Sequence, residues 1–259
     1  MGFVNVANAE VPGRDSLGWR AKFGVIAPST NTVVEPEFHA MSVPGVTAHN
    51  ARIHIRDQHM VDNTGMENLL AQIRAEIGGA VERVMTAEPD YMVMGMSAET
   101  FWGGVEGNRQ FIKQIHDLSG LPVATGAEAC ERALHLYGAK RIGVVTPYQP
   151  VGDDNVVQFF SEIGFDVVNI KGLRCPTAVS IAHVTERELR DALVEVNTGD
   201  IDALVQCGTN LSMVRLADEA ERWLDKPVIA INAATWWMAL RDNGVGDQLQ
   251  GFGGLLRDH

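Results

Sequence analysis

Hydrophobic positions fall into two kinds of segment along the chain. Short apolar runs, several of them nearly continuous Val, Ile and Met, alternate with longer segments in which apolar residues recur every three or four positions. The short runs predict β-strands, in places buried on both faces, and the longer segments predict amphipathic helices. Strands are expected at 22–27, 46–55, 90–95, 121–124, 141–146, 165–170, 201–206 and 226–231. Helices are expected at 66–87, 106–118, 127–137, 153–163, 185–197 and 213–224.

Strands and helices in regular alternation predict an α/β fold with parallel sheets. The second half of the chain also repeats the first, since "FGVIAPST" at 23–30 is matched by "IGVVTPYQ" at 142–149. We therefore expect two similar open parallel-sheet α/β domains related by a pseudo-twofold axis.

The expected boundaries follow from this repeat. Residues 1–20 form an N-terminal extension, 21–127 the first domain and 128–235 the second. The C-terminal segment 236–259 is free to pack back on the first domain.

In open parallel sheets, ligands bind beyond the carboxyl ends of the strands. Four groups of small or polar residues follow predicted strands directly: Pro28–Asn31, Ser97, Tyr148 and Cys207. If the two halves face each other, these residues lie in one cleft, which is the expected active site.

Composition narrows the classes of partner. The net charge of −12, without a basic run, argues against nucleic acid or an anionic membrane surface. No apolar stretch approaches the ~18–20 residues of a membrane span. Three cysteines without CxxC spacing, and histidines without HExxH spacing, predict no metal site and reduced thiols, as in the cytoplasm.

Four motifs in order resemble the aspartate/glutamate racemase superfamily, in its arylmalonate decarboxylase and maleate cis–trans isomerase branch. They are "VIAPSTNTVVEPEF", "MGMSAETFWGG", "VVTPY" and "QCGTNLS", and the resemblance covers about residues 20–255. It implies catalytic roles for Cys207, Ser97 and Tyr148, and substrate contacts from the first loop and from the residues beside Ser97 and Cys207. The implied substrate-binding residues are Pro28, Ser29, Asn31, Met96, Gly208 and Thr209.

Racemases and maleate isomerases of this superfamily use two cysteines, whereas this chain carries Ser97 at the position identified with the first. A single cysteine can protonate one face of a planar enediolate, and hydroxyl and N–H donors can stabilise its charge. The favoured hypothesis is therefore a decarboxylase of a malonate-like dicarboxylate that needs no cofactor, with Cys207 as proton donor.

Three alternatives stay open. A maleate-type isomerase would use Cys207 as a nucleophile, and a related racemase or isomerase is a variant of the same chemistry. A non-catalytic protein that binds small mono- or dicarboxylates would use the same cleft. The sequence leaves open whether the chain forms a homo-oligomer, and whether Cys175 or His183 reaches the pocket.

Overall fold

The computed structural model describes residues 15–259. The predicted N-terminal extension falls mostly on residues 1–14, which lie outside this range. None of the described helices is both long and apolar enough to cross a membrane.

The first half builds a four-stranded parallel sheet of order β2-β1-β3-β4. Its strands are β1 (Ala21–Pro28), β2 (Val46–Ile53), β3 (Tyr91–Met94) and β4 (Val123–Ala124). Strand β1 pairs with β2 on one side and β3 on the other. All four residues of β3 are buried, as its uninterrupted apolar sequence predicts.

The second half repeats this arrangement with the order β6-β5-β7-β8. The strands are β5 (Arg141–Thr146), β6 (Asp166–Gly172), β7 (Ala203–Gln206) and β8 (Val228–Ala230). The prediction of two similar parallel α/β sheets is confirmed. Because every strand pair is parallel, the carboxyl ends of each sheet lie along one edge.

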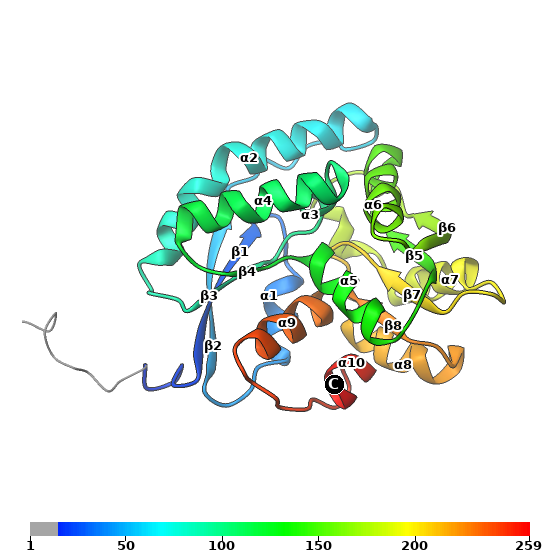
Figure 1. Ribbon diagram of the computed structural model, residues 1–259. Helices are drawn as coiled ribbons and strands as arrows, with labels where there is room; N and C mark the ends of the chain where they lie inside the picture. The colour runs from blue at the N-terminus through cyan, green and yellow to red at the C-terminus, as the bar shows by residue number, and fades with distance from the viewer. Residues whose placement is uncertain (1–14) are drawn as a thin grey trace, which may run out of the picture.

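Helices cover both faces of each sheet (Figure 1). The first sheet lies between α2 (Asn63–Met85) with α4 (Gly104–Ser119) and α1 (Val34–Ala40) with α9 (Ile231–Asp242). The second sheet packs on α6 (Pro150–Glu162), α7 (Glu186–Val196) and α8 (Val214–Leu224). The remaining helical segments are α3 (Ala98–Phe101), α5 (Gly126–Leu136), η2 (Ser180–His183) and α10 (Gly254–Asp258).

Helix starts follow local capping chemistry. The Asp62 side chain accepts a hydrogen bond from the Gly65 N–H at 2.8 Å and begins α2. Thr185 and Glu188 form a capping box at the start of α7. These side chains satisfy backbone N–H groups that the first helical turn leaves without partners.

The two halves pack together through α2 and α4 against α6, and α5 packs against α9. Helix α9 lies on β3, β4 and α1, and its Trp236 is fully buried. The Trp236 indole N–H donates to the Met41 carbonyl at 2.8 Å, and its ring stacks on Phe38. A C-terminal helix therefore covers part of the first sheet, while the exact domain boundaries stay a prediction.

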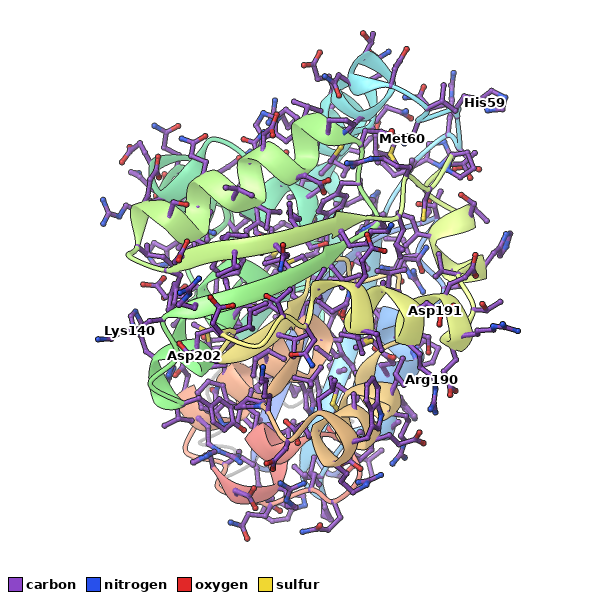
Figure 2. All side chains as sticks on the ribbon, turned by 90° about the vertical axis from the view of Figure 1, so that its right-hand side faces the viewer. His59, Met60, Lys140, Arg190, Asp191 and Asp202 are labelled. Atoms are coloured by element: carbon purple, nitrogen blue, oxygen red, sulfur yellow. The ribbon has the colours of Figure 1, made fainter. Side chains whose placement is uncertain are left out.

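The strands of the second half start at one end of the molecule and point toward the other. At their start, the Asp202 carboxylate accepts from the backbone N–H groups of Lys140 and Arg141, each at 2.8 Å. Figure 2 shows Lys140 and Asp202 on the side away from Met60. Met60 is buried at the opposite end, where the strands finish.

Candidate active site

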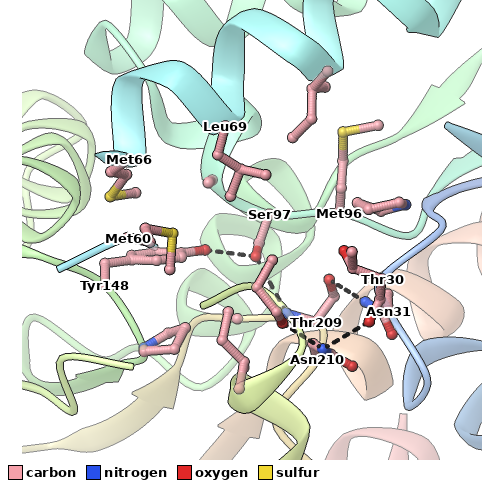
Figure 3. Close-up of a pocket in the computed structure, with 17 residues that line it drawn as sticks. Thr30, Asn31, Met60, Met66, Leu69, Met96, Ser97, Tyr148, Thr209 and Asn210 are labelled. Carbon is pink, nitrogen blue, oxygen red and sulfur yellow. Dashed lines mark hydrogen bonds between the residues drawn. The ribbon is translucent and has the colours of Figure 1, made fainter. Parts of the chain in front are cut away.

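A cavity lies where the carboxyl ends of the two sheets meet (Figure 3). Strand ends from both halves supply its walls: Pro28 at the end of β1, Ser97 after β3, Tyr148 after β5 and Gly208 after β7. This is the edge that the strand-end rule indicates for ligand binding.

Two hydroxyl groups form the closest polar contact in the cavity. The Ser97 Oγ lies 2.6 Å from the Tyr148 phenolic oxygen, and the backbone N–H of Thr209 donates to Ser97 Oγ at 3.2 Å. Ser97 stands at the N-cap position of α3 without capping it through its side chain. The hydroxyl is therefore directed toward the second half of the chain and available to a ligand.

Tyr148 carries a neutral phenol that can donate or accept a hydrogen bond. Burial raises the pKa of its phenol, the charge that a Cys207 thiolate would carry adds to the rise, and the Ser97 hydrogen bond opposes it. Arg174 fixes its backbone, since the guanidinium donates to the Tyr148 carbonyl at 2.5 Å and is itself held by Asp153 at 2.6 Å. A rigid neutral phenol suits the stabilisation of a carboxylate or enediolate oxygen.

Asn31 both begins helix α1 and crosses to the second half. Its side-chain oxygen accepts from the N–H groups of Val33 and Val34 at 3.0 and 2.9 Å, and its amide nitrogen donates to the Thr209 hydroxyl at 3.0 Å. One N–H of the amide is left for a ligand.

The loop after β7 depends on a glycine. Gly208 has φ of +128°, and a Cβ built there would lie 2.6 Å from Cδ of Pro147. Only glycine fits this backbone conformation and this close approach. The loop then brings the Thr209 side chain and N–H to the wall of the cavity.

Asn210 is a lining residue that sequence reasoning missed. Its side-chain oxygen accepts from Thr32 N–H at 2.9 Å, and its amide donates to the Ala178 carbonyl at 3.0 Å. The motif "QCGTNLS" contains this asparagine, so the sequence could have indicated it as a site residue.

The opposite wall of the cavity is apolar. Met66, Leu69 and Ile73 project from helix α2, and Met60 precedes that helix (Figure 3). Met96 and Ile181 extend the same surface. The strand-end rule could not reveal these residues, because a helix packed over the strand ends supplies most of them.

The cavity lining includes no acidic, basic or histidine side chain among residues 15–259. An anionic ligand would be held by neutral N–H and O–H donors alone. The same described part of the chain holds no cluster of three or more His, Cys, Asp or Glu side chains placed to bind a metal ion.

Two of the predicted site residues lie outside the lining. Ser29 is turned to the end of β2, where its hydroxyl accepts from the Ile55 N–H at 2.9 Å. Cys207 is fully buried directly before Gly208, and its own backbone N–H donates to the Val145 carbonyl at 2.8 Å. The structure therefore differs from the expectation that Cys207 lines the cleft: the residue directly after β7 is enclosed in the core.

Burial raises the pKa of the Cys207 thiol well above its ordinary value, and Cys130 and Asp153 add to the rise. Cys207 is therefore a neutral thiol at pH 7. Cys130 and Cys175 are buried too, and neither they nor His183 line the cavity.

Comparison with known proteins identifies the family. A model of the arylmalonate decarboxylase family matches residues 23–256. The chain belongs to the arylmalonate decarboxylase family. It is thus an enzyme of the isomerase or carboxy-lyase type found in the aspartate/glutamate racemase superfamily, as the four motifs indicated.

Relatives within the family are of two kinds. A maleate isomerase of Pseudomonas putida is 26% identical over 249 residues, covering 91% of this chain and 96% of its own. An arylmalonate decarboxylase of Bordetella bronchiseptica is 26% identical over 168 residues, covering 63% of this chain and 69% of its own.

A solved structure shares the fold along almost the whole chain. It is a cysteine-to-serine mutant of Nocardia farcinica maleate cis–trans isomerase with a covalently bound succinylcysteine intermediate. The TM-score is 0.84 at 23% identity, and the match covers 92% of this chain and 99% of the other.

Proposed function

We propose that this chain catalyses cis–trans isomerisation of a maleate-like dicarboxylate, with Cys207 as the nucleophile. The observation that carries the proposal is the presence of two adjacent sets of neutral donors in one cavity, linked through the Thr209 N–H. Ser97 and Tyr148 form one set, and Asn31 with Thr209 forms the other. Two sets suit the two carboxylates of one substrate. The full-length similarity to maleate isomerases supports this reading over decarboxylation.

The chemistry proposed for the site is addition followed by elimination. The Cys207 thiolate forms a C–S bond to one alkene carbon, and the π electrons move into the adjacent carboxylate as an enediolate. Donation from the Ser97 and Tyr148 hydroxyls would stabilise that oxyanion. The former double bond is now single and rotates, after which the enediolate collapses, expels the thiolate and leaves the trans product.

For this reaction, Cys207 has to meet two conditions. The sulfur must reach the cavity beside Gly208 when the dicarboxylate is bound, and it must lose its proton for the addition. Because burial raises the pKa of the thiol, the rate should increase with pH above neutrality. A complex in which the sulfur stays enclosed in the core would contradict the role of Cys207.

The test is conversion of maleate to fumarate, followed by proton NMR. Cys207→Ala should abolish conversion while keeping the fold. Cys175→Ala is the matched control, because it removes another buried thiol from a position outside the cavity. Full activity in Cys207→Ala would eliminate the mechanism.

A second candidate is decarboxylation of a malonate that carries an apolar substituent. The wall of Met60, Met66, Leu69 and Ile73 favours it, since such a group gains from contact with apolar side chains. Here Cys207 would give its proton to the enediolate carbon after CO2 leaves. Release of CO2 from substituted malonates, without conversion of maleate, would show that the enzyme is a decarboxylase and not an isomerase. Binding of dicarboxylates without turnover of either kind would indicate a non-catalytic role.

A further inference from the structure

Glu37 is an acidic side chain of helix α1 that makes all of its recorded hydrogen bonds to the second half. Its Oε1 accepts from the N–H groups of Met213 and Val214 at 3.1 and 3.3 Å, and from the Ser212 hydroxyl at 3.4 Å. Its Oε2 accepts from the Asn232 amide at 2.6 Å. Helix α8 has no cap from its own N-cap side chain at Met213, so a carboxylate from the other half supplies one.

Asn232 continues this network toward the cavity. It is almost fully buried, and the same amide nitrogen also donates to the Thr209 carbonyl at 3.0 Å. Thr209 in turn contacts three groups of the first half: Ser97 through its N–H, and Gly95 and Asn31 through its hydroxyl. Glu37 therefore holds the segment 207–213 at two points, directly at the start of α8 and, through Asn232, at the Thr209 carbonyl.

We propose that Glu37 is a positioning residue, which holds the 207–213 segment so that Thr209 and the neighbouring Cys207 keep their places beside the cavity. The assignment deepens the proposed isomerase function and rests on it for its kinetic consequence. Glu37 itself contacts none of the groups that would react.

Burial raises the pKa of Glu37 to about 7, and the hydrogen bonds that its neighbours donate oppose that rise and favour the carboxylate. Every recorded partner of Glu37 is a donor, so both of its oxygens must accept. Glutamine has one acceptor and one NH2 group. In Glu37→Gln, one donor must therefore face another, either at the start of α8 or at Asn232. Rotating the Asn232 amide to relieve the second case would break its bond to Thr209.

A simpler role is that Glu37 only caps α8 and stabilises the fold. The two roles predict different measurements. Loss of a cap lowers the melting temperature and leaves kcat unchanged. Loss of positioning lowers kcat, because a displacement of about 1 Å at a reacting group can cost ~10²-fold.

The first measurement compares Glu37→Gln with Glu221→Gln. Glu221 is the matched control, because it is a mostly buried carboxylate on α8 that accepts from the N–H groups of Gly254 and Val228 at 2.7 and 3.3 Å, away from the cavity. Both substitutions should lower the melting temperature. Only Glu37→Gln should lower kcat, measured with the substrate that the wild-type enzyme converts. The expected loss is ~10- to 10²-fold, with a much smaller change in KM.

Asn232→Ala provides a second variant, which keeps the cap of Glu37 on α8 but removes the link to Thr209. It should reproduce the loss of kcat, and the double variant with Glu37→Gln should lose less than the product of the single losses, as expected for one network. A wild-type kcat in Asn232→Ala, or a Glu37→Gln enzyme that loses stability alone, would overturn the positioning role.

Hydrogen exchange separates this proposal from the proposed function. In Glu37→Gln, the backbone amides of Thr209, Met213 and Val214 should exchange faster than in Glu221→Gln, whether or not maleate is turned over. Failure of the wild type to isomerise maleate, with faster exchange in Glu37→Gln, would refute only the proposed reaction. Unchanged exchange of these amides would refute the role of Glu37.

Discussion

Removal of a single oxygen atom tests the role of the hydroxyl pair. Tyr148→Phe keeps the ring in its buried position and deletes the group that lies 2.6 Å from Ser97 Oγ. Ser97 keeps its hydrogen bond from the Thr209 N–H, so no hydroxyl is left without a partner. The free energy of unfolding should fall by about 1 kcal/mol, the usual net contribution of one hydrogen bond.

The effect on catalysis should be much larger. If the phenol stabilises the enediolate, its loss should lower kcat by ~10²–10³-fold, or about 3–4 kcal/mol in the barrier. The barrier therefore changes by ~2–3 kcal/mol more than the stability does. A hydroxyl that only packs and bonds to Ser97 cannot produce this difference.

Tyr91→Phe is the control for this measurement. The Tyr91 hydroxyl donates to Asp242 at 2.7 Å, outside the cavity, so the variant also loses one partly buried hydrogen bond. The assay is steady-state conversion of maleate for all three proteins, with melting temperatures recorded in parallel. The reasoning would be refuted if Tyr148→Phe kept more than about a third of wild-type kcat, or if Tyr91→Phe lost as much.

Three further outcomes are expected. Because burial raises the pKa of Cys207, Cys130 and Cys175, the native protein should consume iodoacetamide slowly at pH 7, and all three thiols should react after unfolding in urea; rapid alkylation of native Cys207 would contradict its enclosure. Gly208→Ala combines a φ of +128° with a Cβ only 2.6 Å from Pro147, so it should cost at least ~1–3 kcal/mol in unfolding free energy and most of the activity; a stable, active variant in a urea titration would show that the loop adapts. Trp236→Ala removes a fully buried ring and its hydrogen bond to Met41 and should cost ~3–5 kcal/mol by the same titration, whereas a loss below about 1 kcal/mol would mean that α9 contributes little to the core.

Periodicity predicted the sheets well because their strands are short, apolar and separated by amphipathic helices. It did not predict α9, whose residues from Ile231 to Leu240 are all buried. A helix enclosed on every side has no polar face, so its sequence lacks the period that marks surface helices. It also follows β8 without a turn, so the strand predicted at 226–231 extended one residue into the helix. Helix α1 was missed because it has only seven residues.

The candidate site was predictable where it depends on strand ends. Ser97, Tyr148 and Gly208 each follow a strand and meet in the cavity. Met66 and Leu69 were not predictable, since their place depends on how α2 packs over the strand ends. The orientation of Cys207 depends on the course of one residue at the end of β7, and no pattern of hydrophobic positions determines that.

The position of α9 near the end of the chain has a consequence for synthesis. Domains generally begin to fold during translation, from the N-terminus onward. The strands of the first sheet are complete once β4 has left the ribosome, but one of its faces lacks part of its cover until α9 follows more than a hundred residues later. Asn232, which holds the Thr209 carbonyl, arrives on the same helix. A nascent or truncated chain that ends before residue 231 should therefore carry an exposed apolar face and an untethered loop at the thiol. A helix made near the end of synthesis thus completes the core and the candidate active site in one step.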